Sequence, residues 1–128
     1  LQNCYGGVVD MHLHDERDVK DLDAIYREAW AITLVPFHEG VFRLAGWGHI
    51  MGGYDAGYYG YLWAQVYGDD MFSRFESEGP MSADVGAAYR REVLETAGSR
   101  PAIDRVRGFL RREPSNEAFL RNIGLGKT

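Results

Sequence analysis

The longest helical pattern in the sequence is the run AGYYGYLWAQVYGDDMFSRFESE at residues 56–78. Its apolar side chains recur at the three- and four-residue spacing of an α-helix and cover more than one face, which is typical of a buried helix. Gly79 and Pro80 follow directly and favour a helix end, because glycine suits a left-handed C-cap and proline cannot continue the hydrogen-bond ladder. The run therefore predicts one long helix from about Ala56 to Glu78.

Shorter helical patterns lie on both sides of this run. Upstream, the apolar spacing predicts a helix from Asp21 to Leu34, and residues 8–14 are expected to end another helix that the charged run at residues 15–18 cuts short. Downstream, three more helices are expected: one capped by Ser82 that ends near Gly98, one with Pro101 in its first turn that Pro114 ends, and one capped by Ser115 and closed by Gly124. No strand pattern is present in the sequence, so the expected fold class is all-α.

Between the helix that ends near Leu34 and the long central helix, helical periodicity is absent and glycine is frequent. Of the 16 glycines, eight fall within 29 positions, at 40, 46, 48, 52, 53, 57, 60 and 68, and this stretch continues into the expected central helix. We expect a long loop from Val35 to about Gly53, which together with the tyrosines that follow it makes a Gly/Tyr-rich loop. Loops of this length in a compact domain are usually functional or disordered.

Length and composition exclude several classes of protein. The 128 residues correspond to a single domain or a fragment, and 45% hydrophobic with 26% charged residues is an ordinary globular composition. The net charge of −5 makes nucleic acid and anionic membranes poor partners, and no apolar run is long enough to span a bilayer. Cys4 is the only cysteine, which excludes an internal disulfide and favours the cytoplasm. Because the chain opens with Leu1, we expect it to be a piece of a longer protein.

The histidines do not form a recognisable metal site. His12 and His14 are two apart and diverge on a helix, so we interpret them as structural or solvated. His38-Glu39 resembles the start of the zinc-peptidase signature H-E-x-x-H, but Phe42 occupies the position of the second histidine. We therefore expect no metal to be bound by this chain alone.

The candidate for chemistry is the segment around His49, Tyr54, Tyr58 and Tyr61. Tyr58 and Tyr61 share a face of the expected helix, and the other two side chains lie in the loop just before it, so the four polar tips can converge. A phenol stays protonated at neutral pH and can donate to an oxygen that gains negative charge. The spacing alone favours the other interpretation, an aromatic helix start that packs into a core with its hydroxyls bonded to nearby carbonyls.

The segment GHIMGGYDAGYYGYLW (residues 48–63) resembles the C-terminal part of the thimet oligopeptidase and oligopeptidase F family of zinc metallopeptidases. The similarity continues through DMFSRF (70–75), YRREVL (89–94), GSR (98–100) and FLRREPS (109–115) to Gly124-Leu125, and residues 1–34 match the preceding helix pair more weakly. One departure is Arg111, which stands where the family usually has glycine.

The resemblance implies a helical part of a catalytic domain that hydrolyses short peptides with one zinc ion. It assigns His49 and Tyr61 to the substrate carbonyl and its oxyanion, Tyr54 and Tyr58 to the substrate cleft, and Gly52 and Gly53 to a flexible pair beside them. The zinc-binding H-E-x-x-H helix is upstream in the family and absent from this sequence. The chain is thus expected to be inactive alone, and to need the upstream zinc-binding part of the same protein as its partner.

Two further expectations remain. A freestanding, non-catalytic helical module that binds peptides or a protein through the tyrosine segment is the alternative to an oligopeptidase part. In either case, the helices around residues 22–34 and 59–75 are too apolar for the short C-terminal helices to cover, so self-association of the isolated chain is expected.

Overall fold

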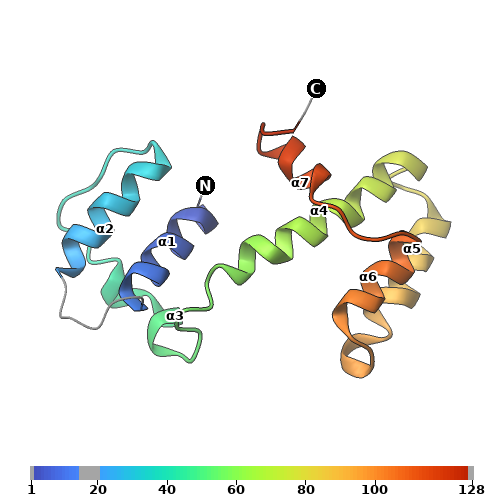
Figure 1. Ribbon diagram of the computed structural model, residues 1–128, viewed down its shortest axis with the longest axis horizontal. Coiled ribbons are helices and arrows are strands. Elements are labelled where there is room, and N and C mark those ends of the chain that lie inside the picture. The colour runs from blue at the N-terminus through green and yellow to red at the C-terminus, as the bar shows by residue number, and fades with distance from the viewer. Residues whose placement is uncertain (1, 15–20, 127–128) are drawn as a thin grey trace. The chain divides into compact units, whose positions relative to one another are not determined.

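The computed structural model describes residues 2–14 and 21–126, and all regular secondary structure within these ranges is helical (Figure 1). This confirms the all-α fold class. The charged run at residues 15–18, expected to end the first helix, lies outside the described residues. The chain divides into two compact units, residues 1–63 and residues 64–128.

The first unit is built on two helices that lie side by side, α1 (Gln2–His14) and α2 (Leu22–Trp30), drawn in blue in Figure 1. The side chain of Asp21 caps α2 by accepting hydrogen bonds from the N–H groups of Asp23 and Ala24, both at 3.1 Å. The α-helix ends at Trp30, earlier than expected, and continues as the 3-10 turn η1 (Ala31–Thr33). The Thr33 hydroxyl donates to the carbonyl of Trp30 at 2.8 Å, which favours a tight last turn.

The core of the first unit is aromatic. Tyr5 and Val9 of α1 pack against Tyr26 and Ala29 of α2, and all four are buried. The predicted long loop is anchored to this core by three partly buried side chains, Phe37, Leu44 and Trp47. It is also less irregular than predicted, because it contains the 3-10 turn η2 (Leu44–Gly46) and the short helix α3 (Gly48–Met51).

The long helix α4 (Gly60–Glu78) ends where Gly79-Pro80 predicts, but it begins four residues later than expected. Ala56 has a φ of +54°, a left-handed conformation that an α-helix does not contain. The expectation that α4 is buried by its apolar faces is wrong. Its buried residues are Asp70 and Arg74, whereas the Trp63 side chain is 58% exposed.

The two buried charges of α4 have partners from the C-terminal segment. Asp70 accepts hydrogen bonds from the Arg112 guanidinium, at 2.5 and 3.0 Å, and from the N–H of Ser115 at 2.8 Å. Arg74 donates to the carbonyl of Phe109. Because buried charges are stable only when paired and hydrogen-bonded, these contacts attach the C-terminal segment to α4.

The second unit continues with α5 (Ala83–Tyr89), the π-helical turn η3 (Arg90–Leu94), the 3-10 turn η4 (Ala97–Ser99), α6 (Ala102–Leu110) and α7 (Glu117–Asn122). Its core is formed between α5 and α6, which are drawn close together in Figure 1, by Val85, Ala88, Val106, Phe109 and Leu110. Among the described residues, no helix is both long and apolar enough to cross a membrane.

The helix boundaries of the second unit follow the predicted capping residues with local shifts. The Ser82 hydroxyl accepts from the N–H of Val85 as predicted, but the regular helix ends at Tyr89, and further on the Thr96 hydroxyl donates to the carbonyl of Glu92. Pro101 is the N-cap of α6 and does not lie in its first turn, and α6 ends before Pro114, at Leu110.

The remaining shifts concern the C-terminal helix and its approach. Arg111 has a φ of +57°, a conformation that glycine adopts without strain. Asn116 is the N-cap of α7, while Ser115, predicted to be the cap, accepts from the N–H of Glu117 at 3.1 Å. Gly124 follows α7 with a φ of +79°, as expected for a closing glycine.

Candidate functional site

Five rings of the first unit converge and form a ring cluster, which consists of Trp47, His49, Tyr54, Tyr58 and Tyr61. The His49 ring lies 5.8 Å from Tyr54, 5.1 Å from Tyr58 and 5.8 Å from Tyr61 between centroids. The structure thus brings together the four side chains singled out in the sequence. Trp47 was not predicted as a member, and it joins through an edge contact with Tyr58 at 4.8 Å.

Four consecutive segments supply these rings. Trp47 is the N-cap of α3, and His49 lies within this helix. Tyr54 and Tyr58 come from the turns between α3 and α4, and Tyr61 lies in the first turn of α4. The N–H of Tyr61 donates to the carbonyl of Tyr58 at 3.1 Å, so the two tyrosines meet across one turn although Tyr58 precedes the helix.

Two polar atoms of the cluster lie within hydrogen-bond distance of each other. His49 Nε2 lies 3.1 Å from the Tyr61 hydroxyl. Tyr54 and Tyr61 are 41% and 40% exposed, so a ligand can reach both rings. Burial raises the pKa of the Tyr58 phenol, and the neighbouring Tyr61 raises it further, which keeps this phenol protonated.

The two glycines expected beside the cluster have local geometric reasons to be glycine. Gly53 has a φ of +79°, which favours glycine whatever the surrounding space. A Cβ on Gly52 would lie 2.7 Å from the carbonyl oxygen of Gly48. Both therefore form the tight turn that leads from α3 to Tyr54.

Helix α1 contacts the same turns through residues that the sequence analysis did not single out. The Asp10 carboxylate is 1% exposed and accepts hydrogen bonds from the N–H groups of Ala56 at 3.0 Å and Tyr58 at 2.9 Å. A Cβ on Gly6 would lie 2.3 Å from the Tyr58 ring. The only sequence signal was an acidic residue within an otherwise apolar stretch, four positions before His14.

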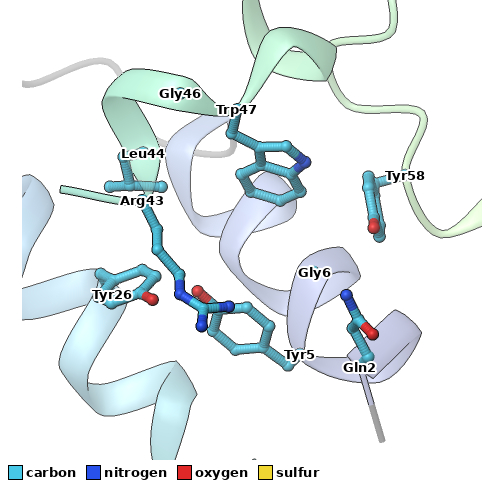
Figure 2. Close-up of a pocket in the computed structure, with 9 residues that line it drawn as sticks. All are labelled: Gln2, Tyr5, Gly6, Tyr26, Arg43, Leu44, Gly46, Trp47 and Tyr58. Atoms are coloured by element: carbon cyan, nitrogen blue, oxygen red, sulfur yellow. The ribbon is translucent and has the colours of Figure 1, made fainter. Parts of the chain in front are cut away.

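A cavity of about 270 Å³ lies beside the ring cluster (Figure 2). Gly6, Trp47 and Tyr58 line one part of it, and Tyr5 and Tyr26 line another. Figure 2 shows the Arg43 side chain extending toward Tyr5 and Tyr26, so the cavity combines aromatic walls with one cationic group.

The described residues do not offer a zinc site. Within residues 2–14 and 21–126, no three histidine, cysteine or acidic side chains are grouped closely enough to hold a metal ion. His38 and Glu39 lie outside any helix, and Glu39 pairs with Arg27 at 2.5 Å. His14, for its part, contacts Asp10. The residues that the structure describes thus do not fit the ligand set of a resident zinc ion.

Comparison with known proteins finds matches along nearly the whole chain. The sequence profile of peptidase family M3 matches residues 2–125. Saccharolysin from Saccharomyces cerevisiae is 36% identical and oligopeptidase A from Escherichia coli 37% identical, each over 98% of this chain. Thimet-like oligopeptidase from Dictyostelium discoideum is 37% identical over 80% of it. The chain spans only 15 to 19% of the length of these three relatives.

Proposed function

Because the chain belongs to peptidase family M3, we propose that it supplies the substrate-binding and oxyanion-stabilising side chains of a zinc oligopeptidase that cleaves short peptides. The observation that carries the proposal is the convergence of His49 and three tyrosines in one partly exposed ring cluster. A cluster of packing aromatics needs neither an accessible phenol nor a hydrogen bond between an imidazole and a phenol, and this cluster has both.

The central step is donation of a hydrogen bond from Tyr61 to the scissile carbonyl oxygen. A carbonyl oxygen gains negative charge as a nucleophile adds to its carbon, so a donor held at that position stabilises the transition state more than the bound substrate. His49 Nε2 lies 3.1 Å from the Tyr61 oxygen. In the tautomer that carries its proton on Nε2, His49 donates to that oxygen and leaves the phenolic proton free for the substrate. Donation in series polarises the phenol and strengthens its own bond to the oxyanion.

Tyr54 and Tyr58 act on the bound peptide in this proposal. Tyr54 is 41% exposed, and its ring lies 5.6 Å from that of Tyr61, so it can contact the peptide next to the scissile bond. Tyr58 is less exposed, and its ring lies 4.9 Å from that of Tyr61 between centroids, so it can pack against Tyr61 and orient the Tyr61 phenol. Gly52 and Gly53 let the preceding turn approach a peptide backbone closely.

The zinc ion and the water-activating glutamate belong to a different part of the protein in this proposal. M3 is a family of zinc metallopeptidases, and the described residues of this chain do not hold three suitable ligands together. The partner of the chain is therefore the upstream zinc-binding part. Cys4, the single cysteine of this chain, favours a reducing compartment, and we propose the cytoplasm as the location.

Complementation tests the proposed function. The chain is expected to restore hydrolysis of a short quenched-fluorescence peptide when joined to the zinc-binding part of an M3 peptidase, whereas each part alone is inactive. The matched control is the same joined protein with Tyr59→Phe, which alters a half-exposed tyrosine outside the ring cluster. If the chain binds the peptide alone but never restores hydrolysis, it is the freestanding binding module and the proposal is wrong.

A further inference from the structure

We propose that Asp10 is a positioning residue for the ring cluster: its buried carboxylate holds the backbone turn from which Tyr58 projects and after which Tyr61 begins α4. This inference rests on the proposed function in one respect, namely that the ring cluster is the functional site. The assignment itself depends on contacts between α1 and residues 56–58, which are measurable without any peptide hydrolysis.

Both carboxylate oxygens of Asp10 are committed to this turn. Oδ1 accepts from the N–H of Ala56 at 3.0 Å, and Oδ2 accepts from the N–H of Tyr58 at 2.9 Å. The donors are separated from Asp10 by 46 and 48 positions, so these are tertiary contacts between α1 and the turn. Because Asp10 is 1% exposed, water does not compete for the two N–H groups.

The turn that Asp10 holds contains an unfavourable backbone conformation. Ala56 has a φ of +54°, where its Cβ is unfavourable and where glycine is usually found. Strained residues persist only where surrounding contacts over-determine them. The hydrogen bond from the Ala56 N–H to Asp10 is such a contact, and α4 begins four residues later, at Gly60.

Helix α1 also sets the position of the Tyr58 ring. A Cβ on Gly6 would lie 2.3 Å from a Tyr58 ring carbon, so the ring occupies the space that glycine leaves open. Gly6, Asp10 and His14 are four residues apart and share one face of α1. His14 Nδ1 lies 2.7 Å from the carbonyl oxygen of Asp10 and 3.1 Å from Oδ1, and it donates because a carbonyl only accepts. One face of α1 thus carries three residues with related contacts. Gly6 packs against the Tyr58 ring, Asp10 binds the Tyr58 N–H, and His14 contacts Asp10.

Asp70 provides a matched comparison. It is also buried, at 2% exposure, and it also accepts a backbone N–H, that of Ser115 at 2.8 Å. It lies in the second unit, where Arg112 is its other partner. Asp70→Asn is expected to show the general stabilising effect of a buried carboxylate without any effect on the ring cluster, so it separates that effect from a positioning role of Asp10.

The test compares Asp10→Asn with Asp70→Asn in the isotopically labelled chain. Asn replaces one acceptor oxygen with an NH₂ group that faces an N–H donor, so one hydrogen bond is lost. For Asp10→Asn we expect the Ala56 or Tyr58 amide to exchange with solvent about tenfold faster and the cross-relaxation between the His49 and Tyr61 rings to weaken. Asp70→Asn is expected to leave both readouts as in the parent chain. Parent-like exchange and cross-relaxation in Asp10→Asn would overturn the inference.

A second variant separates positioning from folding. Ala56→Gly lowers the cost of the left-handed turn, so in the Asp10→Asn background it is expected to restore part of the His49 to Tyr61 cross-relaxation. If Asp10→Asn unfolds the first unit and Ala56→Gly does not reverse this, Asp10 is needed for the fold as a whole and the inference is wrong.

Kinetics of the joined enzyme distinguish this inference from the proposed function. With zinc content unchanged, Asp10→Asn is expected to lower kcat more than it raises KM, because the binding surface remains while the donor is misplaced. Should Tyr61→Phe retain full kcat in the same enzyme, the proposed function fails, and the exchange and cross-relaxation data still decide the role of Asp10.

Discussion

The Tyr61 hydroxyl lies 3.1 Å from Nε2 of His49, so α3 and α4 present a phenol and an imidazole as one hydrogen-bonded pair. The two residues are 12 positions apart, and the turns between them contain Tyr54 and Tyr58. The hydrogen-bonded pair and the side chains around it therefore come from one continuous segment. Its geometry depends on that segment keeping its turns.

Removing the Tyr61 hydroxyl is expected to slow catalysis selectively. In the joined enzyme, Tyr61→Phe should lower kcat on the order of 10²-fold, about 2.7 kcal/mol, with little change in KM, because the lost bond is strongest in the transition state. Steady-state kinetics on a short fluorogenic peptide measure this effect, with Tyr59→Phe as the control that keeps kcat. A nearly unchanged kcat together with a lower melting temperature would show that Tyr61 belongs to the core instead.

The first unit is expected to lose stability at alkaline pH. Burial raises the pKa of both Tyr5 and Tyr58 above the ordinary phenol value, so the folded state keeps protons that the unfolded state releases. The contribution of these two phenols to the free energy of unfolding should be constant below about pH 10 and fall as the pH rises further. Thermal melts across this range measure the fall, and Tyr5→Phe or Tyr58→Phe should make it shallower. A flat profile in the parent chain would contradict the prediction.

The second unit is expected to depend on Asp70. Asp70→Asn removes an acceptor that Arg112 and the N–H of Ser115 share, and it should lower the free energy of unfolding by about 1–3 kcal/mol. Glu76→Gln is the control, since its pair with Arg121 is about half exposed and worth about 1 kcal/mol or less. Urea unfolding compares the two variants. Equal losses of unfolding free energy in the two variants would indicate that the buried Asp70 carboxylate stabilises the unit no more than an exposed ion pair does.

The isolated chain is expected to hold no zinc. No three candidate ligands are grouped among the described residues, and three is the usual minimum for a catalytic zinc ion. Metal analysis after dialysis against a weak chelator is the measurement, with the joined enzyme as the positive control at one equivalent. One tightly bound equivalent of zinc in the isolated chain would contradict the assignment of the metal to the upstream part.

Self-association of the isolated chain is expected from its exposed apolar side chains. Leu34, Phe42 and Met51 of the first unit are 88%, 77% and 91% exposed, and a second copy can cover them. Light scattering over a dilution series should give a mass above 14.5 kDa that decreases on dilution, and Phe42→Ser should reduce it. A constant monomeric mass at every concentration would count against this prediction.

The sequence by itself determined the helical class, several helix limits and four of the five rings that come together in the ring cluster. Asp21, Ser82 and Gly79 mark their helix ends correctly because capping depends on hydrogen bonds within three or four residues. His49 and the three tyrosines were predictable as a group because they lie within 13 positions, so that one short segment can bring them together.

Only the tertiary structure decided which buried charges hold the segments in place. Helix α4 buries Asp70 in place of an apolar face. The local pattern could not predict this, because the partner Arg112 lies 42 positions away. Asp10 likewise finds its two donors 46 and 48 positions away and supports the left-handed Ala56 that shortens α4 at its start. Local patterns report the backbone preferences of neighbouring residues, whereas the partner of a buried carboxylate is set by which distant segment packs against it and excludes water.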